Sequence, residues 1–400
     1  MNGVFAIEKP SGVTSAKFIA KIQAIFTKSD VFAQDLTDAR NKTLADLSSN
    51  KHWSKQKINS KVQNIKVKIG HGGTLDPLAS GILVVGVGNG TKKLQAYLNG
   101  STKTYETKAL LGISTTTGDC EGEILTKNPV DHVTKEMVLA IPEKFIGDLK
   151  QTPPIFSALK LNGKPLYEYA REGIPLPEAI KVREVKVNSL HIFPDDILSV
   201  DHDFKKLESE LDENGEPKEH ALASNPTLND SPLYFSKQYM DKLAEEGKEL
   251  ESYKPIMLRD DQELPEKLPM IHFSASVSSG TYIRSLISDI GRALHSSAYM
   301  VELIRSKQAE WEIGKNVFKI EDFTDRDERI WGPVLKTVLD NGSEINVAEE
   351  FKSMSDKVLP LIEKEKEALA KYAAQSSQEA TEEVNEEAIP KKRSIDEVET

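Results

Sequence analysis

Alternating apolar and polar residues predict two β-strands that each have one buried face. In residues 103–111 every second side chain, from Tyr105 to Leu111, falls on the same side, and residues 271–277 show the same period of two. Strand-like apolar runs occur in four further places, at residues 4–7, 65–69, 82–87 and 182–193. The longest of these runs is far too short to cross a bilayer, so no membrane span is expected.

Two other stretches carry apolar residues at the three- and four-residue spacing of an amphipathic helix. The first follows Thr14 or Ser15, either of which can cap it, and runs to Phe26. The second runs from Thr281 to Leu294. Weaker helical patterns occur at residues 91–98, 134–145 and 333–372.

A glycine-rich stretch, Gly70–Gly81, lies between two of the predicted strands and is therefore expected to be a loop at a sheet end. Its glycines allow the backbone to come close to a ligand. Pro77 restricts Asp76 to extended backbone geometry, so the loop presents this carboxylate from a stiff segment. From spacing alone, Asp76 either caps a backbone amide in a tight turn or serves as a functional carboxylate.

The formal net charge of −11 is unevenly distributed along the 400 residues. Residues 1–194 carry +8 (26 basic against 18 acidic residues) and residues 270–320 carry +2 (6 against 4). Residues 195–269 carry −11 (9 against 20) and residues 321–400 carry −10 (11 against 21). The parts with the clearest motifs are thus basic. Their positive charges either contact phosphate groups or belong to ordinary lysines that are solvated at the surface. The single cysteine excludes a disulfide framework and a cysteine zinc site.

Several segments, in order along the chain, resemble the motifs of the TruB family of tRNA pseudouridine-55 synthases. They are Glu8–Gly12, the loop Gly70–Gly81, the strand Lys103–Leu111, the run Gly280–Arg284 and the segment Leu303–Arg305. The last departs from the family's Leu-Arg-Arg pattern at Ile304. The resemblance covers residues 3–26, 65–194 and 270–323.

The resemblance implies a catalytic centre built on Asp76, Tyr105 and Arg284. Asp76 corresponds to the catalytic nucleophile, and an aspartate is ionised at neutral pH without an activating base. Tyr105 corresponds to the tyrosine that stacks on the target base and is the favoured acceptor of its proton. Arg284 corresponds to the arginine that pairs with the aspartate, and a planar guanidinium can hold a carboxylate through two hydrogen bonds.

Further residues are implied to bind the substrate. His71 can occupy the gap left by the flipped base, Tyr282 lines the base pocket and Leu303 forms its apolar floor. Lys9, with Pro10, braces the catalytic loop. Residues 151–173 look like the family's thumb region, which packs against the tRNA T-arm and offers Lys160, Lys164 and Arg171 as phosphate contacts, with ordinary surface charge as the alternative for all three.

The implied fold is the α+β pseudouridine-synthase fold, a mixed, mainly antiparallel sheet flanked by helices. The expected organisation is a catalytic domain at 1–323, a basic insertion at 27–68, an acidic insertion at 195–269, a helical extension at 324–375 and an acidic, disordered tail at 376–400. The basic insertion is expected to be either a flexible RNA-contacting arm or a disordered loop. The weak patterning of residues 200–262 predicts that they can be deleted with the core still folded. No pattern of an RNA-binding PUA domain is found.

The implied reaction converts uridine to pseudouridine in the T-loop of tRNA, at position 55, with T-loop-like hairpins in other RNAs as occasional substrates. It consumes neither electrons nor water, so neither a redox cofactor nor a metal is expected. A tRNA-folding chaperone on the same scaffold is the alternative. A phosphotransferase is disfavoured because no Lys-Ser/Thr pair follows the glycine-rich loop.

The resemblance does not predict the cellular compartment, so weaker sequence signals must be used. The basic run Lys391–Arg393 suggests the nucleus, mitochondrial tRNA is a possible second substrate, and the cytoplasm is a third compartment. The first residues lack the basic start and apolar block of a secretory signal. The protein is expected to act as a monomer.

Overall fold

The computed structural model describes residues 1–48, 53–209, 222, 225–259 and 262–386, with side chains in the last helix up to residue 373. Residues 49–52 of the expected basic insertion and the run 391–393, which suggested the nucleus, lie outside the described residues.

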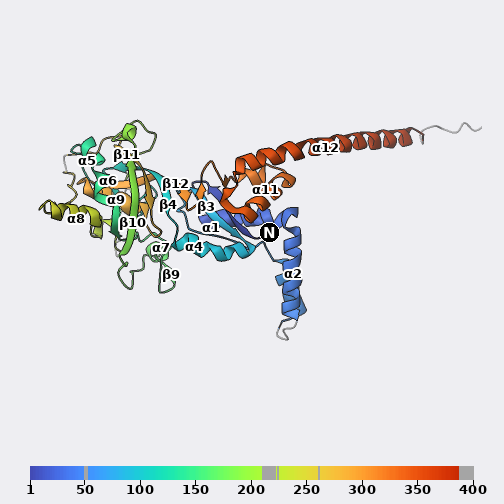
Figure 1. Cartoon of the computed structure of the whole chain (residues 1–400), viewed down its shortest axis with the longest axis horizontal. Helices are drawn as coiled ribbons and strands as arrows, with labels where there is room; N and C mark the ends of the chain where they lie inside the picture. Colours follow the sequence, from blue (N-terminus) through green and yellow to red (C-terminus); the bar gives the residue numbers. More distant parts are fainter. Residues whose placement is uncertain (49–52, 210–221, 223–224, 260–261, 387–400) are drawn as a thin grey trace, which may run out of the picture.

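A ten-stranded mixed sheet forms the centre of the molecule (Figure 1). Its strand order is β14-β1-β3-β12-β4-β11-β10-β7, with β13 paired to β12 and β2 paired to β3. Among the described strands of this sheet, only β1–β14 and β12–β3 are parallel, so the expected α+β class with a mainly antiparallel sheet is confirmed. The strands are β1 Gly3–Lys9, β2 Ile69–His71, β3 Ser80–Val87, β4 Lys103–Leu111, β7 Gly147–Gln151, β10 Arg183–Ile192, β11 Met270–Val277, β12 Ala298–Gln308, β13 Trp311–Glu312 and β14 Val317–Phe318. Two small hairpins pair β5 Ile113–Thr115 with β6 Ile124–Lys127, and β8 Lys160–Leu161 with β9 Lys164–Pro165.

Helices cover this sheet in two groups, each closing an apolar core. The helices are α1 Ser15–Lys28, α2 Ala33–Ser48, α3 Lys55–Gln63, α4 Leu94–Asn99, α5 Lys135–Leu139, α6 Ile141–Phe145, α7 Leu166–Arg171, α8 Lys237–Glu245, α9 Ile283–Ala293, α10 Glu321–Thr324, α11 Glu328–Asn341 and α12 Val347–Glu386. Single 3₁₀ turns stand at Asp30–Phe32, Gly88–Lys93, Pro194–Asp196, Leu228–Asp230 and Gly342–Glu344.

The catalytic-loop candidate lies where the two cores meet. One core is formed by β1 and β3 with α1, α11 and the start of α12, and the other by β4, β10, β11 and β12 with α9. Leu75 and Ala79 of the loop pack into the second core, whereas the strand that follows, from Ile82, packs into the first. Apolar side chains therefore anchor the loop on both sides of Asp76.

The described part of residues 27–68 contains two helices, α2 and α3, where a flexible arm or a disordered loop was expected. Contact of this segment with RNA stays a prediction. The hydroxyl of Ser54 caps α3 by accepting a hydrogen bond from the backbone of Lys57. Each helix has only one fully buried apolar residue, Leu36 in α2 and Ile58 in α3. A single anchor per helix produces no detectable apolar period, so the pattern did not reveal these helices.

The acidic segment 195–269 packs against the catalytic core. Leu228, Phe235 and Leu264 are buried in the core formed with α9, and the ring of Phe235 lies 5.5 Å from that of Phe145. The guanidinium of Arg292 on α9 donates a hydrogen bond to the Ser231 carbonyl. Deletion of residues 200–262 is therefore expected to destabilise the fold, because it would expose part of this core.

Three smaller differences concern the limits of two helices and one strand. The helix expected at 134–145 is divided into α5 and α6, because Pro142 has no N–H to continue the first. Thr91 lies inside a 3₁₀ turn before α4 and does not cap the helix. Of the strand expected at 65–69, only the end pairs, as β2.

The C-terminal part continues as helix beyond its expected limit. After packing on α11, α12 extends away from the body (Figure 1). Its backbone is helical through residues 376–386, where a disordered tail was expected, and the rest of that tail lies outside the described residues. No described helix combines the length and apolar character that a bilayer crossing requires.

Candidate active site

The loop that carries Asp76 is held by hydrogen bonds to its own backbone. The Ser15 hydroxyl donates to the Leu75 carbonyl (3.0 Å) and accepts from the Leu75 N–H (2.9 Å). The N–H of Gly12 donates to the Pro77 carbonyl at 2.8 Å. None of these bonds uses the Asp76 side chain, which remains one-third exposed.

Two side chains of β12 hold the other end of the loop. The Gln308 amide donates to the Gly72 carbonyl at 2.8 Å, and Nη2 of Arg305 donates to the Gly73 carbonyl at 3.1 Å. Gly73 has φ = +143°, a region that strains other residues, and a Cβ there would stand 3.5 Å from Gln308. The second glycine of the pair is thus required by the conformation of the loop.

Lys9 lies beneath the loop as a brace and is only 1% exposed. Its ammonium donates to the carbonyls of Pro10 (2.8 Å), Val13 (2.7 Å) and Pro77 (3.3 Å). Burial lowers the pKa of Lys9 to about 8, an effect that the negative charge of Asp76 opposes. This geometry fits the bracing role and leaves little surface for a direct substrate contact.

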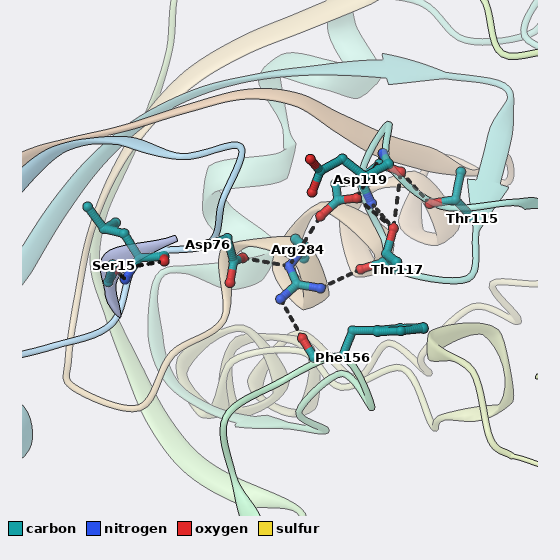
Figure 2. Close-up of polar contacts among 9 residues, drawn as sticks. Ser15, Asp76, Thr115, Thr117, Asp119, Phe156 and Arg284 are labelled. Atoms are coloured by element: carbon teal, nitrogen blue, oxygen red, sulfur yellow. Dashed lines mark hydrogen bonds and ion pairs between the residues drawn. The ribbon is translucent and has the colours of Figure 1, made fainter. Parts of the chain in front are cut away.

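Arg284 meets Asp76 through one hydrogen bond, not the two that were expected. Its Nε donates to Asp76 Oδ2 at 2.8 Å (Figure 2). Nη1 donates to the Thr117 carbonyl at 2.6 Å, and Nη2 to the Phe156 carbonyl at 2.7 Å. The guanidinium, 4% exposed, therefore joins the catalytic-loop candidate to two other segments of the chain.

A second carboxylate, Asp119, faces the same guanidinium and was missed by the sequence analysis. Its Oδ2 lies 3.8 Å from Nε of Arg284, and its other oxygen accepts from the Thr117 hydroxyl at 2.6 Å (Figure 2). Burial alone would lower the pKa of Arg284, but Asp76 and Asp119 together raise it above its ordinary value. The only available sequence signal was a Gly-Asp pair after a strand, which is typical of ordinary turns.

The expected base-pocket residues are buried or half-buried. Tyr105 and Leu303 are buried in the same apolar cluster as Leu75 of the loop. Tyr282 directly precedes α9, and burial raises the pKa of its phenol, so it is neutral at pH 7. Burial, with a smaller contribution from the positive charge of Arg305, lowers the pKa of His71, so its imidazole is uncharged at pH 7.

The three expected phosphate contacts lie on the thumb-like segment in different settings. Lys160 and Arg171 are exposed, and the guanidinium of Arg171 lies over the ring of Tyr167 at 5.3 Å. Lys164 pairs with Glu172 at 2.5 Å. The structure thus leaves Lys160 and Arg171 open to solvent and gives Lys164 an acidic partner.

Gln151, also missed by the sequence analysis, joins the thumb-like segment to the start of α9. Its side-chain oxygen accepts from the Tyr282 N–H at 2.8 Å, and its amide donates to the Tyr282 carbonyl at 3.1 Å. One residue along, the Thr152 carbonyl accepts from the Ser285 hydroxyl at 2.9 Å. Gln151 therefore fixes the backbone that carries Tyr282 and leads into Arg284.

We expect Gln151→Leu to lower the free energy of unfolding by about 2–3 kcal/mol. The substitution leaves two backbone groups of Tyr282 without partners, and each unsatisfied buried group costs about 1–3 kcal/mol. Urea unfolding of both proteins measures the difference. Gln63→Leu, at an exposed position of α3, is the matched control and should stay within about 0.5 kcal/mol of the parent. Equal stabilities of Gln151→Leu and the control would contradict the role of this clamp.

The arrangement is suited to holding a flat ring against a fixed carboxylate. Asp76 is partly exposed and oriented by a buried guanidinium, and its neighbour Leu75 belongs to the apolar cluster that includes Tyr105 and Leu303. Within the described ranges, no cluster of three or more histidine, cysteine or acidic residues has the geometry to hold a metal ion.

Known proteins similar to this chain agree on one family. Residues 35–210 match the TruB family pseudouridylate synthase N-terminal domain. The chain is 49% identical over 375 residues to tRNA pseudouridine synthase 4 of Saccharomyces cerevisiae, covering 91% of each protein. It is 37% identical over 347 residues to tRNA pseudouridine synthase 4 of Schizosaccharomyces pombe, covering 80% of this chain and 82% of that protein. A chain of the solved Cbf5-Nop10-Gar1 complex aligns with a TM-score of 0.40 and 20% identity, covering 88% of this chain and 59% of that one. The chain belongs to the TruB family and is a pseudouridine synthase.

Proposed function

We propose that this pseudouridine synthase acts on tRNA and isomerises the uridine at position 55 of the T-loop. The observation that carries the proposal is the hydrogen-bonded Asp76–Arg284 pair, in a chain 49% identical to a protein named as a tRNA pseudouridine synthase. The same chemistry extends to hairpins of other RNAs that imitate the T-loop.

The reaction exchanges one bond for another without net change in atoms or electrons. The C1′–N1 bond of the uridine breaks, the uracil rotates, C1′ joins C5, and the proton on C5 is lost while N1 gains one. Asp76 acts directly on the nucleotide, by attack on C1′, by attack on the ring or by removing a ribose proton. All three routes use an ionised carboxylate, which Arg284 holds in place at 2.8 Å.

The target base must leave its stack before it can reach Asp76, which lies at a loop on the protein surface. We propose that Tyr105 and Tyr282 enclose the flipped uracil, with Leu303 as the floor of its pocket. His71, neutral because of its burial, fills the vacated position in the RNA. Tyr105 is the acceptor of the C5 proton in this scheme.

The thumb-like segment supplies contacts to the stem below the loop. Lys160 and Arg171 are exposed and can bind phosphates directly, and Lys164 can exchange Glu172 for a phosphate. We propose that the protein binds the T-arm as a monomer, and that it works in the nucleus and the mitochondrion, with the cytoplasm as a third compartment.

An isolated T-arm hairpin is expected to be modified at its single target uridine, more slowly than full-length tRNA. Recognition of RNA generally depends on loops whose bases can be splayed and stacked on aromatic side chains, and the pocket supplies such residues. Mass spectrometry of the hairpin, beside a loop-scrambled hairpin of equal composition, measures the product. Modification of both hairpins alike, or of neither while full-length tRNA reacts, would reject recognition of the local T-loop.

A further inference from the structure

Helix α1 begins at the catalytic loop and carries a basic face on its exposed side. Lys17, Lys21 and Lys28 are exposed and lie within one narrow sector of the helix, because their spacings are four and seven residues. The helix contains no acidic residue. The first residue of the helix, Ser15, is bonded to Leu75, so the helix starts at the loop of Asp76. With 14 residues at 1.5 Å each, it extends for about 21 Å from there.

A second basic segment lies against the same helix although it is forty residues away in sequence. The N–H of Val67 donates to the Thr27 hydroxyl at 3.1 Å, and the Gln23 amide donates to the Val67 carbonyl at 2.9 Å. Val67 is buried by this contact, whereas its neighbours Lys66 and Lys68 are exposed. The pairing therefore turns both lysines outward next to the basic face of α1.

Helix α3 adds three more exposed lysines: Lys55, Lys57 and Lys61. The ammonium groups of Lys57 and Lys61 lie 4.7 and 4.6 Å from the centre of the Trp53 ring. No acidic residue occurs between Asp46 and Asp76, so nothing in this segment balances the positive charge.

Some lysines elsewhere in the chain pair with acidic residues, as Lys164 does with Glu172, Lys307 with Glu312 and Lys336 with Asp340. In the part of the chain that the structure describes, none of the eight lysines named above forms an ion pair. We call this set the basic surface: Lys17, Lys21, Lys28, Lys55, Lys57, Lys61, Lys66 and Lys68.

We propose that the basic surface is a second RNA-binding surface, which holds the phosphate backbone of the double-helical stem adjoining the modified loop. The inference rests on the proposed function, because it places the modified nucleotide at Asp76. An RNA stem that leaves the catalytic loop along α1 meets a row of unpaired ammonium groups over about 20 Å.

The test replaces Lys57, Lys61, Lys66 and Lys68 together by glutamine, which keeps an aliphatic stem and removes four charges. The matched control makes the same change at four exposed lysines of α12: Lys352, Lys357, Lys364 and Lys371. Binding of two T-loop hairpins, one with a short stem and one with a stem longer by a helical turn, is measured between about 50 and 200 mM salt.

We expect the parent and the control variant to bind the long-stem hairpin more tightly than the short-stem hairpin. The basic-surface variant should lose this gain and show a shallower plot of log affinity against log salt, by about 0.7–0.9 for each phosphate that it no longer binds. Circular dichroism establishes that all three proteins are folded. Equal salt slopes in the parent and the basic-surface variant, or equal losses in the two variants, would overturn the proposal.

The assay separates this inference from the proposed function. Pseudouridine formation in tRNA by the parent, combined with unchanged RNA binding in the basic-surface variant, would reject the second surface alone. A parent that forms no pseudouridine in any tRNA would instead reject the proposed function.

Discussion

Replacement of Asp76 by asparagine or alanine is expected to abolish pseudouridine formation while leaving RNA binding largely intact. The asparagine side chain would keep an oxygen that can accept the hydrogen bond from Arg284 but would lose the charge that each proposed route requires. The loop should keep its shape, since Ser15, Lys9 and Gln308 bind its backbone and not its carboxylate. The expected loss is at least about 10⁴-fold, the order seen when one catalytic nucleophile is removed.

The measurement is single-turnover conversion of full-length tRNA by mass spectrometry, together with filter binding of the same RNA. Asp241→Asn, at an exposed position of α8, is the matched control and should keep the parent rate. Appreciable turnover by Asp76→Ala would mean that another group performs the chemistry. The chaperone alternative makes a different prediction: parent and Asp76→Ala would promote tRNA folding equally, and neither would form pseudouridine.

The sheet and the loop could be predicted because each leaves a local trace in the sequence. In β4 and β11 one face is buried, so apolar residues recur at every second position, and this period can be detected in the sequence. In the loop, Gly73 is required by a positive φ and Pro77 stiffens the backbone around Asp76. Such constraints act between neighbouring residues, so they are visible without knowledge of the fold.

Asp119 and Gln151 could not be found in this way, because their roles come from contacts distant in sequence. Gln151 meets Tyr282 across 131 residues, and Asp119 meets Arg284 across a similar separation. Each residue type is common in turns and at strand ends, so nothing local distinguishes it. The buried Phe235 is a comparable case, since the ring of Phe145 that it packs against lies ninety residues earlier in the sequence.

The hydrogen bonds of Arg284 differ from those expected and give its pairing with Asp76 an additional role. The sequence analysis expected two hydrogen bonds between the guanidinium and the carboxylate, whereas the structure gives Asp76 one and the carbonyls of Thr117 and Phe156 one each. The Phe156 carbonyl belongs to the thumb-like segment. Arg284 therefore links the position of Asp76 to the element proposed to bind the RNA stem.

We expect Arg284→Lys to be severely impaired although the positive charge is kept. The three acceptors of Arg284 lie in three directions around a planar group, and a single ammonium cannot meet all of them. Two hydrogen bonds from a charged group, each worth about 1.5–3 kcal/mol, correspond to a loss of roughly 10²–10⁴-fold in rate if they orient the group in the transition state. Single-turnover rates on tRNA measure the loss, with circular dichroism at the assay temperature as the check on folding. Arg326→Lys, an exposed arginine paired with Asp322, is the matched control and should react at the parent rate. A near-parent rate for Arg284→Lys would show that a point charge suffices, and that the carbonyl contacts of the guanidinium do not orient Asp76.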